Sequence, residues 1–158
     1  ENVALEMKKN LNPVAKARAD QRSRIIGGPF WPVKGSREHS IMDEVKPLPG
    51  ETVINKMTNS PFNTTNIDQV LRERGIEALI IAGVVTNGCV EMTARDASDM
   101  GYLCTLAEDA CAAYNAHVHT ISIDTFATTY GMVKSTQEIM SAFHGKMQKA
   151  QSLPAPEI

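Results

Sequence analysis

The sequence has few cysteines, no excess of charge of either sign and no long hydrophobic run. Three cysteines in 158 residues, with no CxxC spacing and no basic-plus-apolar leader, make a secreted disulfide framework a poor interpretation, so we expect a cytoplasmic protein. The 16 Lys and Arg against 18 Asp and Glu give a net charge of −2, and neither nucleic acid nor a membrane surface is therefore an expected partner. The longest apolar run, Ala78 to Val85, has eight residues, whereas a membrane-spanning helix needs about 20.

The residues that are present have the balance of an ordinary folded domain. Hydrophobic residues make up 42% of the sequence and charged residues 22%, which is typical of a soluble globular protein. The length favours one domain over two, and no internal repeat or low-complexity segment interrupts the chain. We therefore expect a single domain over residues 1–158.

The first 49 residues have a weak pattern. Apolar residues between positions 3 and 11 indicate a short helix, which Asn12-Pro13 interrupts because proline disfavours a helical residue before it. Glycine and proline punctuate the stretch that follows, from Gly27 to Gly50, and predict loops. The aromatic pair Phe30 and Trp31 lies within these loops, and we expect it to fill a gap in the core.

After Pro49 the pattern alternates between strand and helix periods. We expect a strand at 52–56, a helix at 66–75, a strand at 78–85, a helix at 89–100, a strand at 102–107, a helix at 116–129, a strand at 132–133 and a last helix from 135. The apolar run 78–85 is typical of a strand covered on both faces. Alternation at this spacing predicts parallel βαβ units and an α/β fold.

Two helix starts in this stretch carry a capping-box pattern. Asn66 is followed three residues later by Gln69, and Ser135 is followed three residues later by Glu138. In such a box each side chain accepts a hydrogen bond from the other residue's backbone N–H. We expect both boxes to form.

Cys89 stands where a functional group is expected in an α/β sheet. The strand predicted to end at Val85 is followed by Thr86-Asn87-Gly88 and then by this cysteine, which opens the next predicted helix. Ligands gather at the carboxyl ends of parallel strands. The unpaired N–H groups of a helix start favour thiolate over thiol and can receive an oxyanion. A nucleophile is one interpretation of Cys89, and a small buried side chain at a tight turn is the other.

Lys56 is the second candidate. It ends the strand predicted at 52–56, so it should reach the same edge of the sheet as Cys89. A cation there would lower the pKa of the thiol and orient an acidic partner. The alternative is a solvated lysine at a strand end.

These residues resemble a known family. The segment from Gly83 to Ala97, GVVTNGCVEMTARDA, is similar to the nucleophile motif of the isochorismatase-like cysteine hydrolases. That superfamily includes N-carbamoylsarcosine amidohydrolase, nicotinamidase, ureidoacrylate amidohydrolase and biuret hydrolase. Lys56 with Ser60-Pro61-Phe62 resembles the family's lysine motif, and the resemblance extends over about residues 41–141.

The resemblance implies a fold and an activity. The fold is a doubly wound, mostly parallel sheet with helices on both faces. The activity is hydrolysis of a small amide, ureido or carbamoyl compound by an Asp–Lys–Cys triad, with Cys89 as nucleophile and Lys56 steadying charge. The backbone N–H groups of Val85 and Cys89 would hold the oxyanion, next to a cis peptide at Val84-Val85. No cofactor is required, and a homo-oligomer, a dimer or tetramer, is the implied assembly.

The sequence departs from the family pattern at the aspartate, which should lie on the first strand. Asp20-Gln21 looks similar, but the residues before it include Lys16 and Arg18 and make a poor central strand. We therefore expect a domain that is incomplete at its N-terminus and lacks its first strand. A catalytically degenerate binding protein is then an alternative. Isochorismatase itself, which cleaves a vinyl ether, is disfavoured because it does not rely on a cysteine such as Cys89.

The remaining candidates are weaker. Phe62 and Tyr130 could form an apolar pocket wall and Thr86 could bind substrate, although Phe62 and Tyr130 also suit the core. His117 and His119 are two residues apart, on different sides of the predicted helix, so solvated or capping histidines are expected and no metal site. Cys104 falls inside a predicted strand and Cys111 just after one, so both are expected to be core or loop thiols.

Overall fold

The computed structural model describes residues 13–27, 35–56 and 58–151, which fall in two compact units, Glu1–Val53 and Ile54–Ile158. The single domain expected over the whole chain stays a prediction. In the first unit, α2 (Pro13–Ile26) precedes two short 3-10 helices, η1 (Arg37–His39) and η2 (Asp43–Val45). The helix expected near residues 3–11 and the aromatic pair Phe30 and Trp31 lie outside the described residues.

The helix α2 was not expected from the sequence. It carries four basic residues and no apolar stripe, so its periodicity gives little signal. Its residues are mostly good helix formers, such as alanine, lysine, arginine and glutamine, and intrinsic propensity favours the helix instead. Asp20 lies in this helix and not on a strand.

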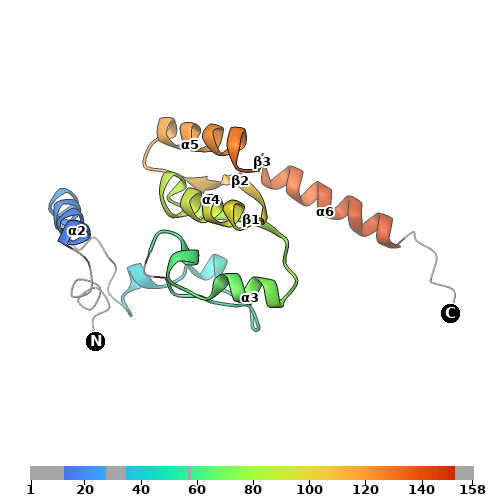
Figure 1. Ribbon diagram of the computed structural model, residues 1–158, viewed down its shortest axis with the longest axis horizontal. Coiled ribbons are helices and arrows are strands. Elements are labelled where there is room, and N and C mark those ends of the chain that lie inside the picture. Colours follow the sequence, from blue (N-terminus) through green and yellow to red (C-terminus); the bar gives the residue numbers. More distant parts are fainter. Residues whose placement is uncertain (1–12, 28–34, 57, 152–158) are drawn as a thin grey trace. The chain divides into compact units, whose positions relative to one another are not determined.

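The second unit is built on a parallel sheet. Its three strands are β1 (Ala78–Val84), β2 (Leu103–Ala112) and β3 (Met132–Lys134), in the order β1-β2-β3, with both pairs parallel. The helices α3 (Ile67–Glu73), α4 (Glu91–Asp99), α5 (Ala116–Thr129) and α6 (Thr136–Gln151) alternate with them. Figure 1 shows this alternation, which confirms the predicted α/β class.

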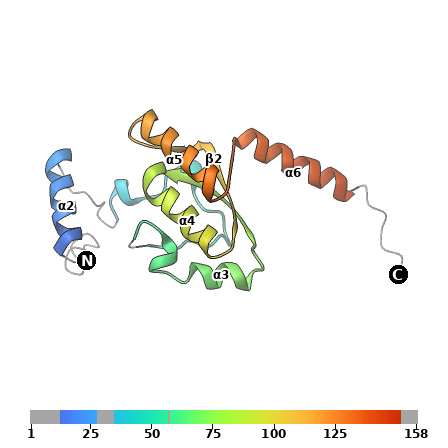
Figure 2. The same cartoon turned by 45° about the horizontal axis from the view of Figure 1, so that its top comes forward.

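The core lies between the sheet and two of these helices. In both views α4 and α5 lie side by side against the sheet (Figures 1 and 2). Leu106 of β2 and Phe126 of α5 are completely buried there, beside two alanines of α4, Ala94 and Ala97. The alanines let α4 approach the strands closely, so this helix packs directly against the sheet.

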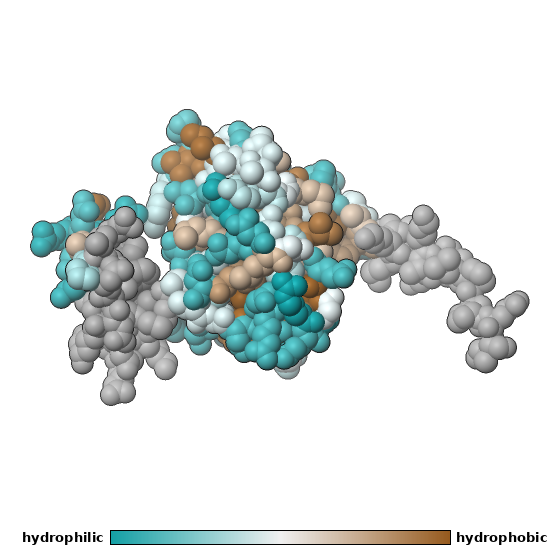
Figure 3. All heavy atoms as spheres, viewed as in Figure 1, coloured by the Kyte–Doolittle hydropathy of each residue, from teal (hydrophilic) through white to brown (hydrophobic). Residues whose placement is uncertain are grey.

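The opposite face of the sheet is less well covered than the sequence indicated. The prediction that β1 is covered on both faces is wrong, because its residues alternate between exposed and half-buried, and Ile80 is 49% exposed. The helix α6 packs on this second face but leaves apolar side chains at the surface, among them Leu103 and Met132. Figure 3 shows hydrophobic residues at the surface beside α6.

The strand expected at 52–56 does not form, and residues 51–56 are irregular. A strand needs a neighbour with which to exchange backbone hydrogen bonds, and in the described part of the chain none pairs with this segment. The structure therefore corrects the placement of Lys56, which does not end a strand.

One of the two predicted capping boxes forms. Ser135 N–H donates to Glu138 Oε2 at 2.8 Å, and Glu138 N–H donates to Ser135 Oγ at 3.2 Å. The box at Asn66 is wrong, because the Asn66 side chain accepts no capping bond. Thr65 Oγ1 accepts the N–H of Ile67 instead, at 3.3 Å.

Candidate active site

The turn that carries Cys89 begins where β1 ends. The pairing of β1 with β2 shifts between Ile81 and Gly83, and Gly83 has φ of +133°, a conformation that glycine tolerates and other residues rarely adopt. Bulges of this kind redirect a strand and are common beside active sites. Gly83 therefore aims the end of β1 into the turn that follows.

Cys89 lies within a single π-helical turn, η4 (Thr86–Val90), immediately before α4. Gly88, inside this turn, has non-helical backbone angles, so the chain is kinked there, directly before Cys89. The sequence predicts Cys89 as the first residue of the helix, and the structure places it two residues before Glu91, the first residue of α4, at the same carboxyl edge of the sheet.

The Cys89 side chain is half-buried and held at the end of β1. Its thiol donates to the carbonyl oxygen of Val84 at 3.1 Å. The hydroxyl of Thr93, in the first turn of α4, donates to the Cys89 carbonyl oxygen at 2.5 Å. The peptide between Val84 and Val85 is cis, as the family resemblance implied.

The other two cysteines lie on β2. Cys104 is buried within β2 and Cys111 lies near the end of the same strand, and both are free thiols. Burial raises the pKa of the Cys104 thiol, and it also raises the pKa of the Cys111 thiol. Both thiols therefore favour the protonated, less nucleophilic form.

Lys56 is exposed, and its ammonium group donates to the carbonyl oxygen of Thr58 at 3.0 Å. Among the described residues no hydrogen bond joins Lys56 to Cys89. The catalytic roles of Lys56 and Cys89 stay a prediction.

The three residues predicted to bind substrate have clear places in the fold. Phe62 lies in η3 (Pro61–Asn63) and packs against the core, with its ring centroid 6.0 Å from that of Tyr102. Tyr130 follows α5, and its ring stacks on Phe126. Thr86 opens the Cys89 turn, and its side chain is completely buried.

Sequence reasoning missed the partner of Thr86. The Thr86 hydroxyl lies 2.9 Å from Nδ1 of His119, a residue in the first turns of α5 and 33 positions away in the sequence. The nearby Asn115 side chain caps α5 by accepting the N–H of Val118. The start of α5 is thereby fixed against the Cys89 turn.

A charged cluster at the start of α4 was also missed. The Glu91 carboxylate forms an ion pair with Arg95, whose guanidinium lies 4.5 Å from the ring centroid of Tyr130. Arg95 also donates to the Tyr130 hydroxyl at 3.4 Å. The i,i+4 spacing of Glu91 and Arg95 was a readable signal in the sequence. These contacts tie the first turn of α4 to the end of α5.

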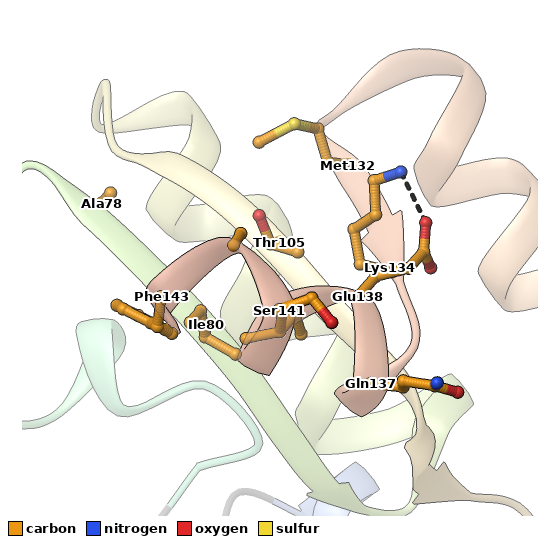
Figure 4. Close-up of a pocket in the computed structure, with 11 residues that line it drawn as sticks. Ala78, Ile80, Thr105, Met132, Lys134, Gln137, Glu138, Ser141 and Phe143 are labelled. Carbon is orange, nitrogen blue, oxygen red and sulfur yellow. Dashed lines mark hydrogen bonds and ion pairs between the residues drawn. The ribbon is translucent and has the colours of Figure 1, made fainter. Parts of the chain in front are cut away.

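A cavity of about 730 Å³ lies elsewhere, between α6 and the exposed face of the sheet. Figure 4 shows Ile80, Thr105 and Phe143 at this cavity, together with the ion pair between Lys134 and Glu138. None of the predicted site residues lines it. We therefore place the candidate active site at the Cys89 turn, on chemical grounds, and not at this cavity.

Two kinds of feature are absent from the residues that the structure describes. No cluster of three or more His, Cys, Asp or Glu side chains there is arranged to hold a metal ion. Within the same residues, no helix combines the length and the apolar character needed to cross a membrane.

The chain is similar to one family model and to several curated proteins. The family model described as Isochorismatase domain matches residues 8–138. Ureidoacrylate amidohydrolase RutB of Acinetobacter baylyi is 35% identical over 120 residues, which cover 75% of this chain and 49% of that protein. The chain spans about half the length of the curated relatives it matches.

Solved structures show the same fold. An isochorismatase-like hydrolase from Alkaliphilus metalliredigens superposes with a TM-score of 0.69 at 28% identity, over 73% of this chain and 64% of that one. A cysteine hydrolase from Pseudomonas syringae pv. phaseolicola gives a TM-score of 0.70 at 26% identity, over 82% of this chain and 64% of that one. With a family match over most of its length and these structural neighbours, the chain belongs to the isochorismatase family.

Proposed function

We propose that this chain carries the nucleophile of a cysteine-dependent hydrolase that acts on a small amide, ureido or carbamoyl compound. The observation that carries the proposal is the position of the Cys89 thiol, half-buried in the turn between β1 and α4, at the carboxyl edge of a parallel sheet. The relatives named ureidoacrylate amidohydrolases support an amide or ureido substrate.

The proposed reaction has two steps. The Cys89 sulfur attacks the substrate carbonyl carbon, and the C–N bond breaks as the nitrogen takes a proton and leaves as ammonia or an amine. Water then attacks the thioester, which releases the acid and restores the thiol. Carbon and sulfur keep their oxidation states throughout, so the chemistry requires no redox partner.

The surrounding groups have proposed roles in this reaction. The backbone N–H groups of Val85 and Cys89 would receive the oxyanion of the tetrahedral intermediates. Lys56 would steady the developing negative charge, since its ammonium group donates one hydrogen bond to the Thr58 carbonyl oxygen and has two further N–H donors. Phe62, Tyr130 and Thr86 stay predictions as substrate-binding residues.

A second candidate function is a binding protein without turnover. The thiol proton needs an acceptor, and in the described residues no carboxylate forms a hydrogen bond with Cys89 Sγ. Asp20, the acid that resembles the family motif, lies in α2 of the first unit. A chain without that acceptor would bind the same class of compound and release no product.

Ammonia release separates the two functions. The full chain is incubated with biuret, ureidoacrylate, nicotinamide and N-carbamoyl amino acids in turn, beside a Cys89→Ser variant and a Cys111→Ser control. We expect Cys89→Ser to reduce turnover by about 10³-fold or more, as loss of a nucleophile does elsewhere, and Cys111→Ser to retain it. Turnover that survives in Cys89→Ser contradicts the proposal, and binding without turnover in the parent chain supports the second function.

We also propose a reducing compartment and a homo-oligomer. The three free cysteines favour the first, and the family resemblance supports the second. Sedimentation of the full chain under reducing conditions tests the assembly, with a mass of two or four times 17.2 kDa as the expected result.

A further inference from the structure

The hydrogen bond between Thr86 and His119 links the Cys89 turn to α5. The Thr86 side chain is 0% exposed, and its hydroxyl lies 2.9 Å from His119 Nδ1. A buried hydroxyl without a partner costs free energy, so the bond is a strong constraint on both residues. It is made three residues before Cys89, within the same turn.

The backbone of the turn is not regularly helical. Gly88, with φ of −125° and ψ of −113°, departs from helical values directly before Cys89. The Val85 carbonyl oxygen accepts two of the turn's bonds, from the N–H groups of Gly88 at 2.9 Å and Val90 at 3.4 Å. The position of the turn therefore depends on side-chain anchors as well as on its own backbone.

Two such anchors flank Cys89. On the C-terminal side of Cys89, the hydroxyl of Thr93 in α4 donates to the Cys89 carbonyl oxygen. On the N-terminal side of Cys89, the Thr86 hydroxyl forms its hydrogen bond with His119. The backbone N–H of His119 donates to the Asn115 carbonyl oxygen at 3.2 Å, in the capped first turn of α5. The thiol thus sits between one anchor on α4 and one on α5.

We infer that His119 is a positioning residue, which acts through the Thr86 hydroxyl to fix the turn that presents the Cys89 thiol. This inference rests on the proposed function for its meaning in catalysis, since Cys89 is the proposed nucleophile. It assigns His119 no contact with substrate and no proton transfer. A threonine hydroxyl both donates and accepts, so the bond forms with either ring tautomer.

Four single variants and one double variant separate positioning from packing. Thr86→Val keeps the shape and removes the hydroxyl, whereas Thr86→Ser keeps the hydroxyl. His119→Leu removes the ring nitrogen, whereas the amide of His119→Asn can place a polar atom near Nδ1. The double variant Thr86→Val/His119→Leu tests whether the two residues act as one unit.

The readout is the rate at which iodoacetamide alkylates Cys89, which requires no turnover. Trypsin places Cys89 alone in the peptide of residues 75–95, whereas Cys104 and Cys111 share the peptide of residues 96–134. Each variant thus reports Cys89 and an internal reference in one digest. Heat unfolding of the same samples measures global stability.

We expect Thr86→Val and His119→Leu each to slow Cys89 alkylation by about three-fold or more, without the same change in the reference peptide. The double variant should match the single ones, and Thr86→Ser and His119→Asn should stay within about two-fold of the parent chain. A Cys89 rate that is unchanged or raised in Thr86→Val and His119→Leu, additive effects in the double variant, or no rescue by the conservative variants overturns the inference.

The alkylation test of this inference can be distinguished from the turnover test of the proposed function. If no substrate is turned over by the parent chain but the alkylation pattern is as expected, the proposed function fails and the inference stands. If turnover is found, the positioning role further predicts that His119→Leu lowers kcat with KM nearly unchanged.

Discussion

Gly131 follows α5 and precedes β3, and a single added methyl group there should disturb the core that supports the site. A Cβ atom at Gly131 would lie 2.4 Å from the Cys104 carbonyl oxygen and 2.9 Å from two ring carbons of Phe126. The backbone of Gly131 is not in the left-handed region. The effect of Gly131→Ala is therefore one of space and not of backbone conformation.

The magnitude follows from what surrounds the new methyl group. The Phe126 ring is completely buried, and the Cys104 carbonyl belongs to β2, so neither can move aside cheaply. Overpacking of this kind costs about 3 kcal/mol at the upper end of its usual range. Replacing glycine also restricts the unfolded chain, which offsets about 0.4–1 kcal/mol. The net loss is about 2 kcal/mol, or about 8 °C in Tm for a unit of this size.

Heat and urea unfolding, followed by circular dichroism, measure this change. The control is Asp124→Glu, which adds one methylene at an exposed position of α5 and should change stability by less than about 0.5 kcal/mol. The double variant Gly131→Ala/Phe126→Leu should lose less than the sum of its single variants, because leucine leaves room for the methyl group. A Gly131→Ala chain as stable as the parent, or strictly additive losses, would refute the reasoning.

Two further predictions concern carboxylates. The Tyr102 hydroxyl lies 2.7 Å from Asp68 and holds the pKa of that carboxyl below its usual 3.8. Tyr102→Phe should therefore raise the Asp68 pKa, as measured by NMR titration, and lower the unfolding temperature; an unmoved pKa contradicts this. Hydrogen bonding, chiefly from Lys134, lowers the pKa of Glu138 from 4.5 to about 2, so its stabilisation is present above pH 4.5 and is lost as the pH falls toward 2. In urea unfolding, the loss of stability as the pH falls should be smaller in Glu138→Gln than in the parent chain. The control Glu108→Gln should lose as much stability as the parent chain.

Local signals in the sequence determine much of the second unit. The helix predicted at 116–129 has the observed bounds, and Asn115 caps its start as expected of that residue type. The strand β2 extends to Ala112, beyond its predicted end at residue 107. The charged residues Glu108 and Asp109 interrupt the apolar pattern, so the sequence does not indicate this extension. It forms because residues beyond them pair with the end of β1, past the bulge at Gly83.

Other features depend on partners that a linear pattern does not reveal. A strand at 52–56 requires a paired neighbour, and the coverage of β1 depends on where α6 lies. In the candidate site, too, the sequence predicts the position of one residue but not a contact between distant residues. The place of Cys89 follows from an apolar strand, a turn and a helix that succeed one another in the sequence. The contact between Thr86 and His119 joins positions 33 residues apart, so only the packing of α5 against the turn reveals it.

The identity of the reactive sulfur tests the account most directly. The full chain is incubated with an electrophilic amide analogue, digested with trypsin and analysed by mass spectrometry. We predict one adduct per chain, on the residue 75–95 peptide that contains Cys89, because burial raises the pKa of both other thiols. An adduct on the residue 96–134 peptide, or an even spread over the three cysteines, would contradict the claim that Cys89 is the nucleophile.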